Sequence, residues 1–137
     1  MTERLVPGRR APGPGPRPAD GDVDGLSEAL ASFPTGVTLV MVADGRDDIG
    51  ATVSAFCPVS QSPPLVLVSL IAGSYPAEVL GRVDRFAVTM LAAGQRALAG
   101  RFAAAGRPGA RLLLEGTPHR RGAASGALIP DGGVAAL

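Results

Sequence analysis

Three short hydroxyl side chains, Thr52, Ser54 and Ser60, lie in a stretch, residues 49–71, that is mostly apolar and rich in β-favouring residues. Two such runs, 49–56 and 65–71, are separated by a connector rich in turn-forming residues. Small residues leave the main chain accessible, so its N–H groups and the neighbouring hydroxyls can bind a flat or anionic ligand. The pattern therefore predicts a ligand shelf formed by a strand.

Side chains able to perform acid–base or nucleophilic chemistry are scarce. The chain has one histidine, one cysteine and no lysine, which excludes a Schiff-base enzyme, an ordinary P-loop and a Cys/His zinc site. His119 precedes two arginines in a poorly patterned segment, and we interpret it as an exposed loop residue. We interpret Asp47 and Asp48 as solvated residues of a hairpin turn. No catalytic residue and no metal ligand is predicted, as expected where a cofactor supplies the chemistry.

Composition predicts one soluble globular domain. The 137 residues are 46% hydrophobic, yet no apolar run approaches the roughly 18 residues of a membrane span. A net charge of +1 argues against nucleic acid as the main partner. Cys57 is expected to be a small buried residue, and a lone cysteine suits a reducing cytoplasm. No apolar segment follows the N-terminal arginines, so neither a signal peptide nor a membrane anchor is expected.

The N-terminal half of the chain predicts an arm, a helix and a β-meander. Residues 1–22 are rich in Pro, Gly and Arg and are expected to be disordered, whereas 23–137 form the domain. Apolar spacing predicts a helix over 24–33. Strands are expected at 35–43 and 49–56 around a polar turn, with 65–71 extending this hairpin.

The C-terminal half has a weaker pattern. A helix is expected at 76–83, a strand at 86–91, and a helix at 95–104 with Leu98 and Phe102 on one face. Beyond Phe102, Gly and Pro interrupt the sequence, and only 112–114 and 133–137 have the composition of strands.

Four ordered motifs resemble the flavin reductase family, whose fold is an FMN-binding split barrel. The motifs are Phe33-Pro34-Thr35-Gly36-Val37-Thr38, Gly50-Ala51-Thr52-Val53-Ser54-Ala55-Phe56-Cys57-Pro58-Val59-Ser60, Ser62-Pro63-Pro64-Leu65-Val66-Leu67-Val68 and Arg85-Phe86-Ala87-Val88-Thr89-Met90-Leu91. Members are the reductase components of two-component flavin-dependent monooxygenases. The implied fold class is mainly β with short helices, a split β-barrel that is incomplete at the C-terminus.

The resemblance implies an NAD(P)H:flavin oxidoreductase that passes reduced FMN to a separate monooxygenase, in an antibiotic or aromatic-compound pathway. The implied flavin-binding residues are Thr52, Val53, Ser54, Ala55, Ser60, Ser74 and Tyr75. Ser74-Tyr75-Pro76 resembles the loop at the flavin phosphate, although the basic residue and threonine usual in that loop are not obvious here. A cytoplasmic homodimer with the flavin at the subunit interface is implied, without a membrane or nucleic-acid partner. The co-substrate can be NADH or NADPH.

One feature keeps other functions open. Relatives usually continue past Leu137 with further barrel strands and a Gly-Asp-His segment near the nicotinamide. The chain can therefore also be a shortened, non-catalytic flavin-binding protein, or a dimerisation partner of a complete reductase. Ser74 can equally be a helix cap, and Thr52 and Ser54 ordinary strand hydroxyls.

Overall fold

The computed structural model describes residues 23–137 except Arg46 and Arg107. The chain divides into two compact units after Pro34, and each is described by itself. The expected arm, 1–22, lies outside the described residues. In the first unit, α1 (Val23–Ala31) confirms the expected helix, although Leu26, Leu30 and Phe33 are all more than half exposed.

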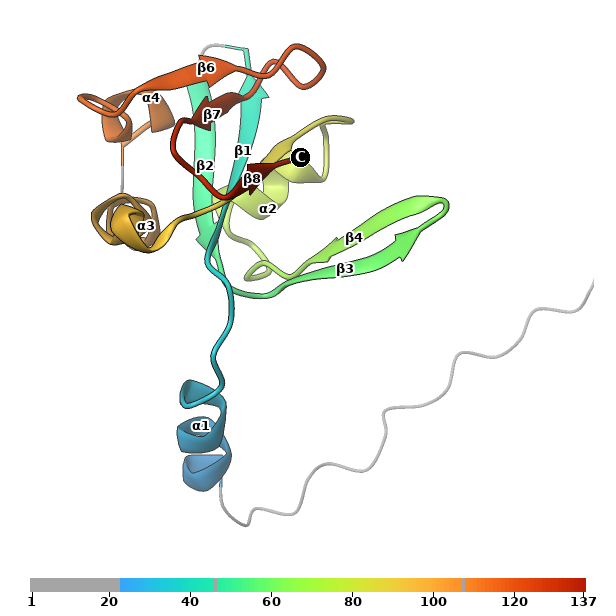
Figure 1. Ribbon diagram of the computed structural model, residues 1–137, viewed down its shortest axis with the longest axis vertical. Helices are drawn as coiled ribbons and strands as arrows, with labels where there is room; N and C mark the ends of the chain where they lie inside the picture. The colour runs from blue at the N-terminus through green and yellow to red at the C-terminus, as the bar shows by residue number, and fades with distance from the viewer. Residues whose placement is uncertain (1–22, 46, 107) are drawn as a thin grey trace, which may run out of the picture. The chain divides into compact units, whose positions relative to one another are not determined.

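The second unit is built from short strands and helices (Figure 1). Its strands are β1 (Thr38–Asp44), β2 (Asp47–Val53), β3 (Phe56–Gln61), β4 (Pro64–Val68), β5 (Ala87–Met90), β6 (His119–Arg121), β7 (Leu128–Pro130) and β8 (Ala135–Ala136). Its helices are α2 (Tyr75–Leu80), the 3₁₀ turn η1 (Ala93–Gln95), α3 (Arg96–Ala103) and α4 (Ala110–Leu113). The main sheet has the order β2-β1-β5-β8, and β3-β4 and β6-β7 form two separate pairs.

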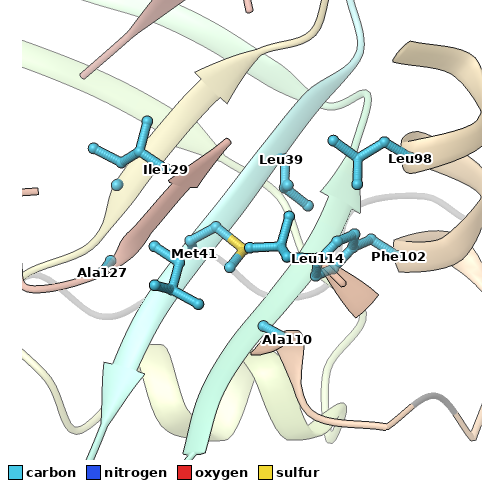
Figure 2. Close-up of a cluster of buried hydrophobic side chains, with 10 residues drawn as sticks. Leu39, Met41, Leu98, Phe102, Ala110, Leu114, Ala127 and Ile129 are labelled. Carbon is cyan, nitrogen blue, oxygen red and sulfur yellow. The ribbon is translucent and has the colours of Figure 1, made fainter. Parts of the chain in front are cut away.

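Strand β1 is the centre of the second unit because its side chains are buried on both faces of the sheet. Leu39 and Met41 pack toward α3, α4 and β7 in a cluster with Phe102 and Leu114 (Figure 2). Val40 points the other way, into a cluster with Val53 of β2 and partly buried side chains of β4 and α2. This alternation is the period-2 pattern of a strand covered on both faces.

Gly50 shows why the first cluster needs a residue without a side chain. It pairs with Met41 across β1 and β2. A Cβ atom at this position would lie 2.5 Å from both Met41 Sδ and Phe102 Cε1. Glycine therefore lets Phe102 of α3 pack directly on the sheet. Leu98 and Phe102 are buried in the same cluster, which confirms that they share one face of the helix.

The expected meander is wrong in its third strand. β1 and β2 pair antiparallel from Thr38↔Val53 to Asp44↔Asp47, as expected, but the other neighbour of β1 is β5. β4 pairs instead with β3, which the sequence predicted as a connector. Cys57 lies on this hairpin and is exposed, so the expectation that it is buried is also wrong.

The C-terminal segment differs from prediction in two places. Residues expected to form a strand at 112–114 belong mostly to α4, in which Ala110 and the following Leu114 are buried in the first cluster. His119 begins strand β6 rather than lying in a loop, and it is exposed as expected. β8 pairs with β5 and confirms strand structure within 133–137.

Candidate functional site

A cavity of about 620 Å³ surrounds β2 at the edge of the main sheet. It is lined by 47–55, 69–71, 74–76, Phe102, Ala103, Gly106 and 108–110. The volume falls in the range of sites that hold a cofactor or drug-sized ligand. An edge strand leaves main-chain N–H and C=O groups on its outer side without a strand partner, so this edge can bind a flat polar ligand.

Most of the hydroxyl shelf lies on the cavity wall. Thr52, Val53, Ser54 and Ala55 all line it, at the end of β2 and directly after it. The Thr52 hydroxyl donates a hydrogen bond of 2.7 Å to the carbonyl of Ala99 in α3, so this threonine also ties the strand to the helix. Ser54 is exposed in a bend beyond the strand and makes no described side-chain hydrogen bond. Its hydroxyl is therefore available to a ligand.

Ser74 and Tyr75 form the facing part of the wall at the start of α2. Ser74 occupies the N-cap position, but its side chain makes no capping hydrogen bond. The Tyr75 hydroxyl donates to Asp44 Oδ2 at 3.4 Å, and Arg82 binds the same oxygen at 2.8 Å. Asp44 thereby anchors the tyrosine ring at the cavity rim.

The structure does not bring Ser60 to this site. Ser60 belongs to β3, and its hydroxyl accepts a hydrogen bond from the Ser62 N–H at 3.2 Å. It is absent from the residues that line the cavity. The sequence could not separate Ser60 from Thr52 and Ser54, because the separation depends on β3 leaving the main sheet.

Asp48 has a structural function that the sequence did not predict. It is 2% exposed, and its carboxylate accepts hydrogen bonds from Arg111 Nε at 2.6 Å and from Arg121 Nη1 and Nη2 at 2.8 Å. The interpretation of Asp48 as turn solvation is therefore wrong. Asp48 lines the cavity and links β2 to α4 and β6, which are 63 and 73 residues away along the chain.

The two arginines determine the ionisation of Asp48. Burial on its own raises the pKa of this carboxyl, but the hydrogen bonds and charges of Arg121 and Arg111 outweigh burial and hold the pKa below its usual value. Asp48 in turn raises the pKa of the Arg121 guanidinium. The cluster consequently holds two positive charges and one negative charge. A single acidic residue beside a glycine-containing strand gives no sequence signal for such long-range pairing.

Comparison with known proteins identifies the family of this mainly β chain. Residues 30–137 match the model of the flavin reductase like domain family. The NADH-dependent FAD reductase of Streptomyces globisporus is 38% identical over 112 residues, which cover 82% of this chain and 61% of that protein. The reductase component of 4-hydroxyphenylacetate 3-monooxygenase from Thermus thermophilus is 37% identical over 92 residues, which cover 67% of this chain and 60% of that protein.

Solved structures agree with these relatives. The flavin reductase component of a bacterial two-component tryptophan halogenase superposes with a TM-score of 0.75 at 34% identity, covering 84% of this chain and 71% of that one. The NADH:FAD oxidoreductase of Streptomyces globisporus, solved in complex with NAD and FAD fragments, superposes with a TM-score of 0.74 at 36% identity. The match covers 82% of this chain and 65% of that one. The chain belongs to the flavin reductase like domain family, and its split-barrel fold class, mainly β with short helices, is confirmed.

The chain spans about three-fifths of the length of these two curated relatives. None of the helices in the described part of the chain is long and apolar enough to cross a membrane. Among those same residues, no group of three or more His, Cys, Asp and Glu side chains is arranged to hold a metal ion.

Proposed function

We propose that this chain is an NAD(P)H-dependent flavin reductase that binds FMN or a related flavin along the outer edge of β2. The observation that carries the proposal is the cavity, which combines a strand edge, two free hydroxyls and an anchored aromatic ring in a member of this family. Relatives named as NADH-dependent FAD and FMN reductases support the reaction class.

The described residues fit a flavin. A planar ring system with polar edges suits a wall that alternates main-chain groups with the small side chains of Thr52, Ser54 and Ala55. The free hydroxyls of Ser54 and Ser74 can bind the polar chain of the ligand. The Tyr75 ring, held through its hydroxyl by Asp44, can stack on a flat ligand at the cavity rim.

A bound flavin supplies the redox chemistry, as the acceptor of a hydride from the nicotinamide of NADH or NADPH. The chain needs to orient the two rings and to exclude water between them, because proximity and orientation provide much of such a rate enhancement. Val53 and Phe102 supply the apolar backing of this site. No side chain is required to gain or lose a proton.

The partners proposed for this chain are a second copy of itself and a separate monooxygenase. The β3-β4 hairpin exposes large apolar side chains, namely Val59, Leu65, Val66 and Leu67, and Ile71 follows it at 81% exposure. A two-stranded hairpin is marginally stable alone, and contiguous apolar surface of this kind is normally covered. A homodimer formed through this hairpin would cover it beside the cavity. Two relatives of this chain are named as reductase components of a monooxygenase and of a halogenase, which supports a separate monooxygenase as the other partner.

A cytoplasmic location belongs to the same proposal. It is supported by the exposed thiol of Cys57, which suits a reducing compartment.

An anaerobic titration tests the function. FMN is added to the purified protein, NADH follows, and flavin absorbance and fluorescence are recorded. Binding at micromolar FMN with bleaching faster than that of free FMN is the expected result. Ser54→Leu, which places a bulky side chain on the cavity wall, should weaken FMN binding at least about tenfold, equivalent to roughly 1.4 kcal/mol. Ala97→Leu, at an exposed position of α3 outside the cavity and outside the hairpin, should leave binding unchanged.

A second candidate function is non-catalytic flavin binding. It requires only the flavin cavity described above and no nicotinamide site. Binding of FMN without accelerated bleaching would select this candidate. A folded protein that binds no flavin would contradict both functions and leave a dimerisation partner of a complete reductase.

A further inference from the structure

Among the described residues that line the cavity, none supplies a positive charge for the phosphate of a nucleotide. They include two carboxylates, Asp47 and Asp48, and no basic side chain. The negative charge of Asp48 is already compensated by two arginines. A cation at the rim of this described wall would stabilise a bound nucleotide.

Arg111 is placed to provide that cation. It directly follows Gly109 and Ala110, which line the cavity, and its Nε lies 2.6 Å from Asp48 Oδ2 on the same wall. The side chain is 59% exposed. Among the described residues, the terminal nitrogens Nη1 and Nη2 of Arg111 make no hydrogen bond, so their N–H groups are available to a ligand.

Arg121 differs from Arg111 in this respect. Both of its terminal nitrogens bind Asp48, and Nη1 also donates to the carbonyl of Gly126 at 2.6 Å. Arg121 alone can therefore neutralise Asp48 through a bidentate ion pair. The positive charge of Arg111 is then in excess. Because Nε is anchored, the Arg111 guanidinium is held in place and loses less freedom than an unanchored side chain when it binds an anion.

We propose that Arg111 binds a phosphate group of the nucleotide held in this cavity. The assignment rests on the proposed function and adds a residue that neither the sequence motifs nor the shelf contain. Strand geometry separates Asp48 from Thr52 by about 13 Å, four residues at roughly 3.3 Å each. Arg111 thus lies toward one end of the cavity and the free hydroxyl of Ser54 toward the other. The phosphate can come from a flavin nucleotide or from the nicotinamide dinucleotide.

The test compares dissociation constants of riboflavin, FMN, FAD and NADH for the wild type, Arg111→Gln and Arg120→Gln. Arg120 is a matched control because it is also an exposed arginine in one ion pair, 2.7 Å from Asp131 Oδ1. Arg111→Gln should weaken at least one phosphate-bearing ligand by about tenfold and leave riboflavin unchanged. The loss should shrink at high ionic strength, and Arg111→Lys should restore part of the affinity.

The pattern of losses identifies the source of the phosphate. Equal losses for FMN and FAD indicate the flavin's own phosphate, and a loss for FAD without FMN indicates the second phosphate of that dinucleotide. A loss confined to NADH indicates the nicotinamide dinucleotide. Thermal unfolding of each variant, without ligand, controls for damage to the Asp48 cluster.

Three results would overturn the assignment of Arg111. These are an equal loss for riboflavin, no change for any ligand, or the same losses in Arg120→Gln. Failure of the proposed function is distinguishable, because the wild type would then bind neither riboflavin nor FMN. If the wild type binds neither flavin but still binds NADH, the NADH comparison still tests the assignment of Arg111. If NADH also fails to bind, the phosphate assignment is overturned together with the proposed function.

Discussion

Two buried threonines on neighbouring strands have opposite hydrogen-bonding states. Thr38 of β1 is 3% exposed, and its hydroxyl donates to the carbonyl of Val53 at 2.7 Å. Thr89 of β5 is 1% exposed, and its Oγ1 has no hydrogen-bond partner among the residues that the structure describes. A buried hydroxyl without a partner costs free energy, whereas a satisfied one contributes to stability.

Replacing each threonine by valine should therefore change stability in opposite directions. Valine keeps the branched shape and removes only the hydroxyl. Thr89→Val should leave the free energy of unfolding unchanged or raise it by up to about 1 kcal/mol, and Thr38→Val should lower it by about 1–2 kcal/mol. Chemical denaturation of both variants measures the difference. Equal destabilisation by the two substitutions would contradict this interpretation.

At the level of residues, the sequence predicted what depends on local composition. Small hydroxyl residues on an apolar strand indicated the shelf, and Thr52 and Ser54 do line the cavity. The environment of Asp48 could not be predicted, because both of its partners are more than 60 residues away in sequence. The same holds for Ser60, whose distance from the cavity depends on which strands pair.

At the level of elements, the hairpin is where prediction from sequence failed most. Pro58, Ser60 and Ser62 have the composition of a turn, so the segment was predicted as a connector. The structure forms β3 there, with an irregular register between Pro58 and Ser60 and a partner, β4, outside the main sheet. A proline is tolerated because the pair has only two strands and therefore two edges. Whether this segment forms a strand is decided by its pairing with β4 rather than by the β-propensity of its residues.

The exposed hairpin gives a prediction for the assembly. Leu67→Arg places like charges on the apolar surface of both copies, so the proposed dimer should dissociate to monomers at micromolar concentration. Leu112→Arg is a matched control, since Leu112 is an exposed leucine of α4 outside the hairpin. Size-exclusion chromatography with light scattering measures the mass of each. A wild-type monomer, or dissociation of both variants alike, would refute the hairpin interface.

For the whole molecule, Asp48 joins three regions that are distant in sequence. Its lowered pKa means that the folded state binds the proton less readily than the unfolded chain. The carboxylate therefore contributes stability at pH values above its unfolded-state pKa. This contribution is lost as the pH falls through the lower folded-state pKa.

Asp48→Asn should lower the free energy of unfolding at neutral pH by about 2 kcal/mol. This loss is smaller than that from breaking a fully buried ion pair, because both arginines are partly exposed. The difference from the wild type should shrink between neutral pH and an acidic pH below the ordinary aspartate pKa, because the contribution of the carboxylate is lost as the pH falls toward its lowered folded-state pKa. Asp131→Asn, which removes an exposed pair with Arg120, should cost under about 1 kcal/mol. Denaturation midpoints at both pH values test the prediction, and a difference independent of pH would contradict it.

The described cavity wall comes from three parts of the chain: strand β2 with the two residues after it, residues 69–71 with 74–76, and the end of α3 with Gly106 and 108–110. Each part alone presents only a fraction of the contacts, so a ligand can bind only when all three are folded together. Ligand binding is thus thermodynamically linked to unfolding, and the melting temperature should rise with ligand concentration. Bound ligand should also slow amide hydrogen exchange in all three segments at once, since opening any one of them first requires the ligand to leave.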